Sequence, residues 1–351
     1  MERYTLQKRI VLSFETKKDE DGDVDYTYIV DASVNRDESM VVVTLSSGSI
    51  RFLTTTDFNV IHSIETGHTN ILCTRFIQCA ASIVVICYQN GYVDVYDYIA
   101  QTRIQNYQVA KEIYSAALLC NGKMLVCGDK EHLYFTEVET GKRIGIYRDI
   151  HSDVINTLLP HPVYPTVFAS GSEDGLICMF DIARGNQDDA LVGLFQTDSG
   201  VASMGWFGPN MEMLWCASMT RGLTTWNTTT GMRQLLITDF FPLYSNSGLE
   251  VDYVVGCLTR ENQDPTVLCG SQDGTGFLIN GNHPNQMIGT WKGHQSVIRT
   301  FIELNQKVMT CGEDASVCVW SSTMMKKTPK TTGVERKHRD TDRGKAAYQS
   351  L

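Results

Sequence analysis

The sequence predicts an all-β protein, a seven-bladed β-propeller that is closed by an N-terminal strand and followed by a disordered, basic C-terminal tail. A short strand that ends on an anchor residue recurs through the chain at intervals of 43, 40, 44, 46, 53 and 41 residues. Such intervals are typical of four-stranded propeller blades. The last repeat also contains the residues of a closed polar network, and one apolar strand near the N-terminus is left over to complete that repeat.

The last repeat, residues 293–320, carries the most specific pattern. His294 lies in the loop before it, Thr310 on its second strand, Asp314 in the next turn and Trp320 on its third strand. An indole only donates, a hydroxyl donates and accepts, and an imidazole can bridge a hydroxyl to a carboxylate. We therefore expect these four residues to form one hydrogen-bond network that leaves no buried polar group unpaired.

The earlier repeats keep the anchor position, but its residue type varies. The seven anchors in chain order are Leu53, Tyr96, Thr136, Phe180, Trp226, Ile279 and Trp320. The predicted blades are Tyr26–Glu65, Asn70–Gln108, Ile113–Tyr147, Val154–Phe195, Val201–Ile237, Val251–Trp291 and Val297–Trp320. The last of these lacks a fourth strand, so we expect the apolar run from Arg9 to Phe14 to pair beside Val317–Trp320 and to close the ring without an open edge.

The network is incomplete in the fourth repeat. His151, Ser170 and Asp174 are present, but Phe180 stands in place of the donating tryptophan. The residue types are those of a serine hydrolase triad, yet their spacing follows from strand geometry and no oxyanion hole is evident. We interpret them as structural and expect no catalytic residue.

Composition supports an ordinary globular chain of 351 residues with 42% hydrophobic and 20% charged residues. We predict a propeller over residues 1–322 and a tail over residues 323–351, where eight Lys or Arg face three acids. The tail thus carries +5 and the rest of the chain −15, since the whole carries −10. With little apolar surface, the tail is expected to be disordered and to serve either solubility or nuclear targeting and RNA or ribosome contact.

The 11 cysteines show no metal-binding spacing and read as small buried hydrophobic residues in a reducing compartment. The N-terminus lacks the apolar core of a signal peptide, and no apolar run is long enough to span a bilayer. We therefore expect a cytoplasmic or nuclear protein, or both, without metal, cofactor or membrane contact.

The run GHQSVIRTF with CGEDASVCVW in the last repeat resembles the WD40-repeat family, as do HSDVINTLLPHP, SGSEDGLICMFDI and VDYVVGCL earlier in the chain. The resemblance covers about residues 10–320. It implies a non-enzymatic propeller that binds peptides or proteins on the face where the blades are connected.

We predict that this partner-binding face is acidic. It should carry the acidic loop 19–25, which lacks the downstream glutamate of a calcium loop, and the longest insertion, residues 238–250. The apolar cluster in that insertion either folds down as a cap or stays exposed as an anchor for a partner. The predicted face residues are Asp19, Asp21, Asp23, Asp153, Glu173, Asp239, Phe240, Phe241, Tyr244 and Glu313.

The leading functional hypothesis is a non-catalytic scaffold that binds a basic protein or peptide, in the nucleus or during ribosome assembly, alone or within a larger complex. Nucleic acid would be contacted only through the tail. The alternative is a substrate receptor of a cullin-type ubiquitin ligase, but Arg184 follows Phe180-Asp181 one place too late for the usual Trp-Asp-x-Arg pattern. An enzyme is the third class, and no residue pattern favours it.

Overall fold

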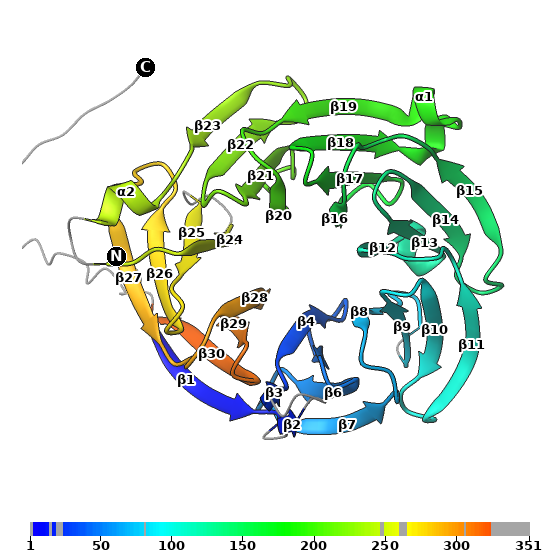
Figure 1. Ribbon diagram of the computed structural model, residues 1–351, viewed down its shortest axis with the longest axis horizontal. Helices are drawn as coiled ribbons and strands as arrows, with labels where there is room; N and C mark the ends of the chain where they lie inside the picture. The colour runs from blue at the N-terminus through cyan, green and yellow to red at the C-terminus, as the bar shows by residue number, and fades with distance from the viewer. Residues whose placement is uncertain are drawn as a thin grey trace, which may run out of the picture.

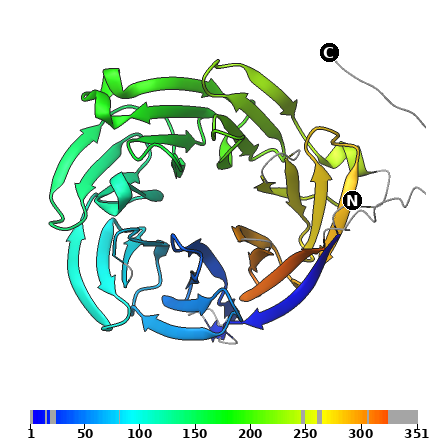
Figure 2. The same cartoon turned by 180° about the vertical axis from the view of Figure 1, so that it is seen from behind.

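The computed structural model describes residues 3–13, 16–18, 24–80, 82–245, 249–259, 265–304 and 307–323. Within these ranges, seven four-stranded antiparallel sheets form a ring around a central channel (Figure 1). The first strand of each sheet faces the channel and the fourth lies on the rim, and the view from behind shows the same arrangement (Figure 2). The predicted seven-bladed propeller is confirmed.

The strand bounds lie within a few residues of the predicted blades. Blades one and two contain β4 (Ile29–Val34), β5 (Met40–Leu45), β6 (Ser49–Thr54) and β7 (Val60–Glu65), then β8 (Ile71–Phe76), β9 (Ile83–Tyr88), β10 (Tyr92–Asp97) and β11 (Thr102–Gln108). Blades three and four contain β12 (Ser115–Leu119), β13 (Met124–Gly128), β14 (Leu133–Glu137) and β15 (Arg143–Tyr147), then β16 (Ile155–Pro160), β17 (Val167–Ser172), β18 (Leu176–Asp181) and β19 (Leu191–Gln196).

The remaining blades continue in the same order. Blades five and six contain β20 (Val201–Phe207), β21 (Met213–Ser218), β22 (Leu223–Asn227) and β23 (Arg233–Ile237), then β24 (Tyr253–Leu258), β25 (Thr266–Gly270), β26 (Thr275–Asn280) and β27 (Met287–Lys292). Blade seven contains β28 (Ile298–Leu304), β29 (Lys307–Gly312), β30 (Ser316–Thr323) and the N-terminal β1 (Arg3–Val11).

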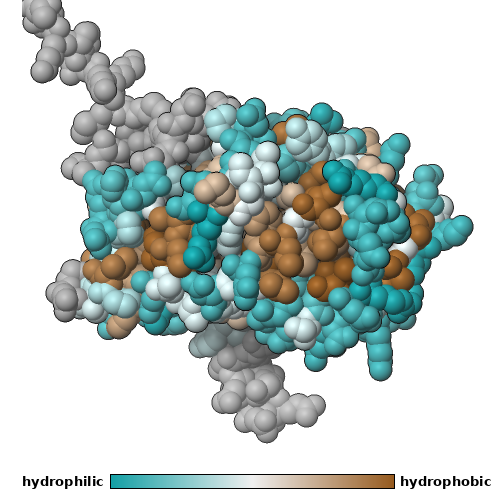
Figure 3. Space-filling model, turned by 90° about the horizontal axis from the view of Figure 1, so that it is seen from above, coloured by the Kyte–Doolittle hydropathy of each residue, from teal (hydrophilic) through white to brown (hydrophobic). Residues whose placement is uncertain are grey.

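Strand composition follows position in the blade. Second strands such as β5 and β9 are nearly continuous runs of Val, Ile and Leu, because both of their faces are buried between neighbouring blades. Fourth strands such as β11 mix polar and apolar residues, because one of their faces meets solvent. Figure 3 shows apolar side chains in a band along one side of the rim, flanked by polar ones.

A β-bulge recurs at one place in the blades. In blades one to six, the register between third and fourth strands shifts directly before the anchor residue, as at Val95/Tyr96, Met179/Phe180 and Thr225/Trp226. A bulge bends the strand and increases its twist. The anchors therefore share one structural position even where their residue type has changed from Trp to Leu, Thr or Ile.

The N-terminal strand closes the ring as predicted, and Leu6 pairs with Trp320 and Ile10 with Val317. It begins at Arg3 and ends at Val11, so the prediction of a strand over residues 9–14 was wrong in its bounds, and Phe14 lies outside the described residues. The polar run before Arg9 hid the start of the strand. Tyr4 packs edge-on against Trp291, with ring centroids 5.2 Å apart.

We call the face that carries the connections between blades and the turns between second and third strands the upper face, and the opposite one the lower face. The upper face includes the unpredicted hairpin of β2 (Thr16–Lys18) and β3 (Val24–Tyr26). The short helices are η1 (Cys120–Gly122), η2 (Ile182–Arg184), α1 (Gln187–Ala190) and α2 (Phe241–Tyr244). No helix among the described residues has the length and apolar character needed to cross a membrane.

Candidate functional site

The four predicted network residues of blade seven lie together. His294 Nδ1 lies 3.1 Å from Asp314 Oδ1, and His294 Nε2 lies 2.8 Å from Thr310 Oγ1. The Trp320 indole N–H donates to Thr310 Oγ1 at 2.9 Å. This geometry fits an imidazole that donates from Nδ1 to the carboxylate and accepts the threonine hydroxyl at Nε2.

Two residues that the sequence reasoning missed complete this network. Ser316 Oγ donates to Asp314 Oδ1 at 2.7 Å, and Arg9 Nη2 lies 3.1 Å from Asp314 Oδ2. Burial opposes ionisation of Asp314, but the hydrogen bonds from His294 and Ser316 outweigh it and hold the pKa of the carboxyl well below its usual value. The pairing of the closing strand could have indicated Arg9, because Arg9 lies opposite Cys318, four residues after Asp314.

Blade four keeps a shorter version of the network. His151 Nε2 lies 2.8 Å from Ser170 Oγ, and His151 Nδ1 lies 3.0 Å from Asp174 Oδ2. Burial lowers the pKa of His151, and the Asp174 carboxylate only partly offsets this effect. Phe180 cannot donate and instead stacks on Phe168.

The His–Ser–Asp geometry of blade four is that of a triad, but its serine is enclosed. Ser170 has no exposed surface, and its hydroxyl lies 3.4 Å from the Cys178 carbonyl oxygen. A nucleophile must be reachable by the carbonyl that it attacks. The trio therefore ties the connection before blade four to its second strand.

Blade two holds a polar cluster that the sequence did not reveal. Tyr88 donates to the buried Asp94 at 2.9 Å, and Asn106 donates to the same carboxylate at 2.8 Å. Arg103 adds a longer contact at 3.6 Å. This polar cluster connects the second, third and fourth strands of the blade, β9, β10 and β11. It borders a hollow of ≈ 220 Å³ that His68 also lines.

The residues predicted for the partner-binding face differ in their surroundings. Asp19, Asp21 and Asp23 lie outside the described residues. Asp239 receives a bidentate contact from Arg221 at 3.0 and 3.1 Å, and Glu313 pairs with Arg299 at 3.0 Å. Asp153 and Glu173 are exposed and form no ion pair within the described part of the chain.

Two residues of the insertion do not lie on a partner-binding face, so that prediction was wrong. Phe240 is fully buried and Tyr244 is 5% exposed, and both belong to the apolar core between blades five and six. The Tyr244 hydroxyl donates to the Pro284 carbonyl oxygen at 2.6 Å. Of the two alternatives for this segment, the structure has the cap, and α2 lies on the outer rim between β23 and β27 (Figure 1).

Phe240 and Tyr244 are buried because the insertion fills the gap between blades five and six. Phe241, next in the chain, remains 38% exposed and lies under the Arg221 guanidinium, 5.0 Å from its ring centroid. Arg221 therefore contacts both Asp239 and Phe241 and holds the start of the insertion against the rim.

Another hollow, of ≈ 640 Å³, lies on the upper face where blades seven and one meet. Tyr26, Tyr28, Glu313 and Arg9 are among its lining residues. The Arg299 guanidinium covers the Tyr28 ring at 4.6 Å. The carboxylates here already have cationic partners, so the hollow has little net charge to offer a ligand.

A metal could be considered at one place among the described residues. Glu131, His132 and Asp149 each bring a ligand atom to within 4.8 Å of the others. His132 Nδ1, however, accepts the Asp149 backbone N–H at 3.3 Å, and both carboxylates are exposed. Exposed acids gather without an ion in many proteins, so we assign no metal to this group.

Comparison with known proteins agrees with the fold. The family model "WD domain, G-beta repeat" matches residues 285–321, which include every member of the blade-seven network except Arg9. The chain is 26% identical over 301 residues to the "WD repeat-containing protein 89 homolog" of Dictyostelium discoideum, covering 84% of this chain and 82% of that relative. It is 28% identical over 217 residues to the "WD repeat-containing protein GTS1" of Arabidopsis thaliana, covering 57% of this chain and 55% of that relative.

These matches confirm the resemblance to the WD40-repeat family. The runs quoted from blades four, six and seven are also those in which the sequence resembles WD repeat-containing protein 89, and the first relative carries that name.

Proposed function

Since the chain is a seven-bladed β-propeller that carries a WD repeat, we propose that it is a non-catalytic scaffold whose upper face binds a basic protein or peptide. Propellers with WD repeats generally act as protein-interaction scaffolds. The proposal adds the chemistry of the partner and the face that it contacts.

The observation that carries the proposal is a group of exposed carboxylates at the upper ends of blades three and four. They belong to Glu131, Asp149, Asp153 and Glu173, and none forms an ion pair within the described residues. Lys130 and Arg148 lie in the same loops, so the group keeps a net negative charge. Unpaired carboxylates attract a basic partner from a distance and help to orient it.

The absence of catalysis is also a proposal. The serine of blade four is enclosed, and burial raises the pKa of the nearby Cys178 thiol to about 12. A thiol in that environment stays protonated and is a poor nucleophile.

The test compares two triple variants of the full chain. Asp149→Asn, Asp153→Asn and Glu173→Gln remove three negative charges from the upper face, whereas Glu139→Gln, Asp188→Asn and Asp189→Asn remove the same charge from exposed positions on the lower face. The probe is a fluorescein-labelled peptide of repeated Lys-Lys-Leu triplets. Fluorescence anisotropy should show at least about a tenfold weaker affinity for the upper-face variant only, with steep salt dependence in the wild type.

Equal weakening in both variants would mean that only net charge attracts the peptide, and the proposal would fail. Circular dichroism of each variant checks that the fold is retained. The tail, residues 324–351, lies outside the described residues, so nucleic-acid contact through it stays a prediction, as does a location in the cytoplasm or nucleus.

The alternative function, a substrate receptor of a cullin-type ubiquitin ligase, has less support. Arg184 lies in η2 on the lower face and pairs internally with Asp181 at 3.6 Å. A docking arginine must be free to meet an adaptor. Binding of ligase adaptor proteins that is lost in Arg184→Ala would nevertheless favour this alternative.

A further inference from the structure

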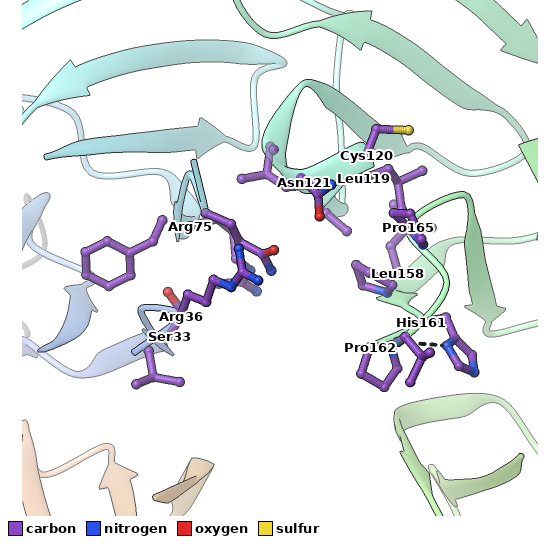
Figure 4. A pocket seen from close by; sticks show the side chains of 18 residues that line it. Ser33, Arg36, Arg75, Leu119, Cys120, Asn121, Leu158, His161, Pro162 and Pro165 are labelled. Carbon is purple, nitrogen blue, oxygen red and sulfur yellow. Dashed lines mark hydrogen bonds between the residues drawn. The ribbon is translucent and has the colours of Figure 1, made fainter. Parts of the chain in front are cut away.

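The channel also has a pocket at its lower end, opposite the upper face. A hollow of ≈ 550 Å³ opens at the lower mouth, between the ends of the innermost strands of blades one to four (Figure 4). We call it the lower channel pocket. Among its lining residues are Arg36, Arg75, Asn121, Leu158, His161 and Val163.

The charge of the pocket is opposite to that of the protein. No Asp or Glu is among the lining residues, although the chain as a whole carries −10. Figure 4 shows the Arg36 and Arg75 side chains pointing together into the hollow from one wall. Arg75 is held by the Asp31 carboxylate, whereas Arg36 is exposed and pairs with no carboxylate in the described ranges.

The acid directly after Arg36 in the chain, Asp37, does not neutralise it. Asp37 turns back into its own loop, where Oδ1 accepts the Ser39 hydroxyl at 2.7 Å and the Ser39 backbone N–H at 3.2 Å. The Arg36 guanidinium is therefore available as a fork of donors for a carboxylate.

The opposite wall is rigid and largely apolar. Leu158, Pro162 and Pro165 line it, and Val163 on the same loop is 58% exposed. His161 fixes this loop, because its Nδ1 accepts the backbone N–H groups of Val163 and Tyr164, each at 3.1 Å.

The turn between the two walls is preformed. Cys120 and Asn121 both adopt left-handed backbone angles, with φ of 52° and 58°, which non-glycine residues adopt only where the surrounding structure holds them. The Cys120 N–H donates to the Pro165 carbonyl oxygen at 2.9 Å and ties the turn to the apolar wall. A pocket held in this way binds without paying much entropy for ordering.

We propose that the lower channel pocket binds an acidic peptide segment, with a carboxylate at Arg36, next to the Asp31-paired Arg75, and apolar side chains against the wall of Leu158, Pro162 and Val163. Together with the proposed function, this gives an upper face that binds a basic partner and a lower pocket that binds an acidic one. One molecule can then hold both partners.

A peptide fits this pocket better than a nucleic acid. Asp37, next to the lining residue Arg36, is exposed, and Asp57, Asp188 and Asp189 are exposed in turns of the outer strands on the same lower face. These acids repel a continuous phosphate backbone that crosses this face. A peptide can place one or two carboxylates at the arginines and apolar side chains on the opposite wall.

The probe is a fluorescein-labelled peptide of repeated Glu-Glu-Leu triplets, added to the purified full chain. Arg36→Glu should weaken binding at least about tenfold, because a charge-assisted hydrogen bond is replaced by repulsion. Lys142→Glu is the matched control, since this exposed lysine also lies on the lower face but outside the pocket, and it should change the affinity by at most about twofold. A peptide of Glu-Glu-Ser triplets should bind more weakly than the leucine probe.

Several results would overturn the proposal. These are no binding of the probe to the wild type, equal weakening by Arg36→Glu and Lys142→Glu, or a single-stranded oligothymidylate that binds more tightly than the peptide and depends on Arg36. The upper-face variant with Asp149→Asn, Asp153→Asn and Glu173→Gln should bind the acidic probe as the wild type does, which keeps this test separate from that of the proposed function.

Discussion

Arg9 Nη2 on the N-terminal strand lies 3.1 Å from Asp314 Oδ2 in the last blade, and the two residues are 305 positions apart in the chain. The ion pair thus joins the strand that closes the ring to the polar network of the blade that it completes. Asp314 is 8% exposed, so its charge depends on these partners rather than on water.

Asp314→Asn should be strongly destabilising. The change removes the charge that His294, Ser316 and Arg9 share, and leaves their donors poorly matched. We expect a loss of about 2–3 kcal/mol in the free energy of unfolding, measured by urea denaturation at pH 7. Asp188→Asn, at an exposed site, should stay within about 0.5 kcal/mol. Similar losses in the two variants would contradict the role given to the network.

The contribution of Asp314 should depend on pH. Its pKa in the folded protein is held below the unfolded value of about 3.9, so the folded state favours the carboxylate. The stabilisation is fully present above that value and is lost as the pH falls below it. The stability difference between wild type and Asp314→Asn should therefore be largest at pH 7 and shrink at pH 3. A difference that grows with acid would show that another group dominates.

Removal of residues 1–11 should open the ring. Eight residue pairs between β1 and β30 disappear, and β30 becomes an unpaired edge beside the buried Trp320. Exposed edges pair with other chains, so we expect a lower melting temperature and self-association. Size-exclusion chromatography with light scattering measures both monomer loss and oligomer size. Removal of residues 324–351 is the control, and a monomeric variant lacking β1 with unchanged melting would contradict the closure.

Alanine substitutions of the two neighbouring phenylalanines in the insertion should differ sharply in their cost to stability. Phe240→Ala empties a fully buried site between blades five and six and should cost about 3–4 kcal/mol. Phe241→Ala removes a ring that is 38% exposed and should cost less than about 1 kcal/mol. Denaturant unfolding of the two variants gives the comparison. Equal costs would mean that the insertion does not act as a cap.

Much of the fold follows from local sequence. The four predicted members of the blade-seven network, His294, Thr310, Asp314 and Trp320, lie within residues 293–320. Their residue types permit few other pairings, so this part of the network could be predicted from spacing alone. The anchors could be placed even where Leu53 or Thr136 replaces tryptophan, because the repeat interval outlasts the residue type.

Contacts between distant segments could not be predicted in this way. An apolar cluster in a loop has the same sequence whether it is exposed or buried, and only the gap between blades five and six decided that Phe240 and Tyr244 lie inside. The same holds for charged residues. The sequence shows the acids Asp239 and Glu313, but it does not show that Arg221 and Arg299 neutralise them.

The sequence by itself determined the number of blades, the existence of the closing strand and four of the residues that hold the last blade together, because these depend on strand periodicity and on short-range hydrogen-bond chemistry. The tertiary structure alone decided which charges remain free and where Arg36 and Arg75 meet an apolar wall. The physical reason is that a pocket at the channel mouth combines the ends of four separate strands, whose relative positions only the closed ring sets.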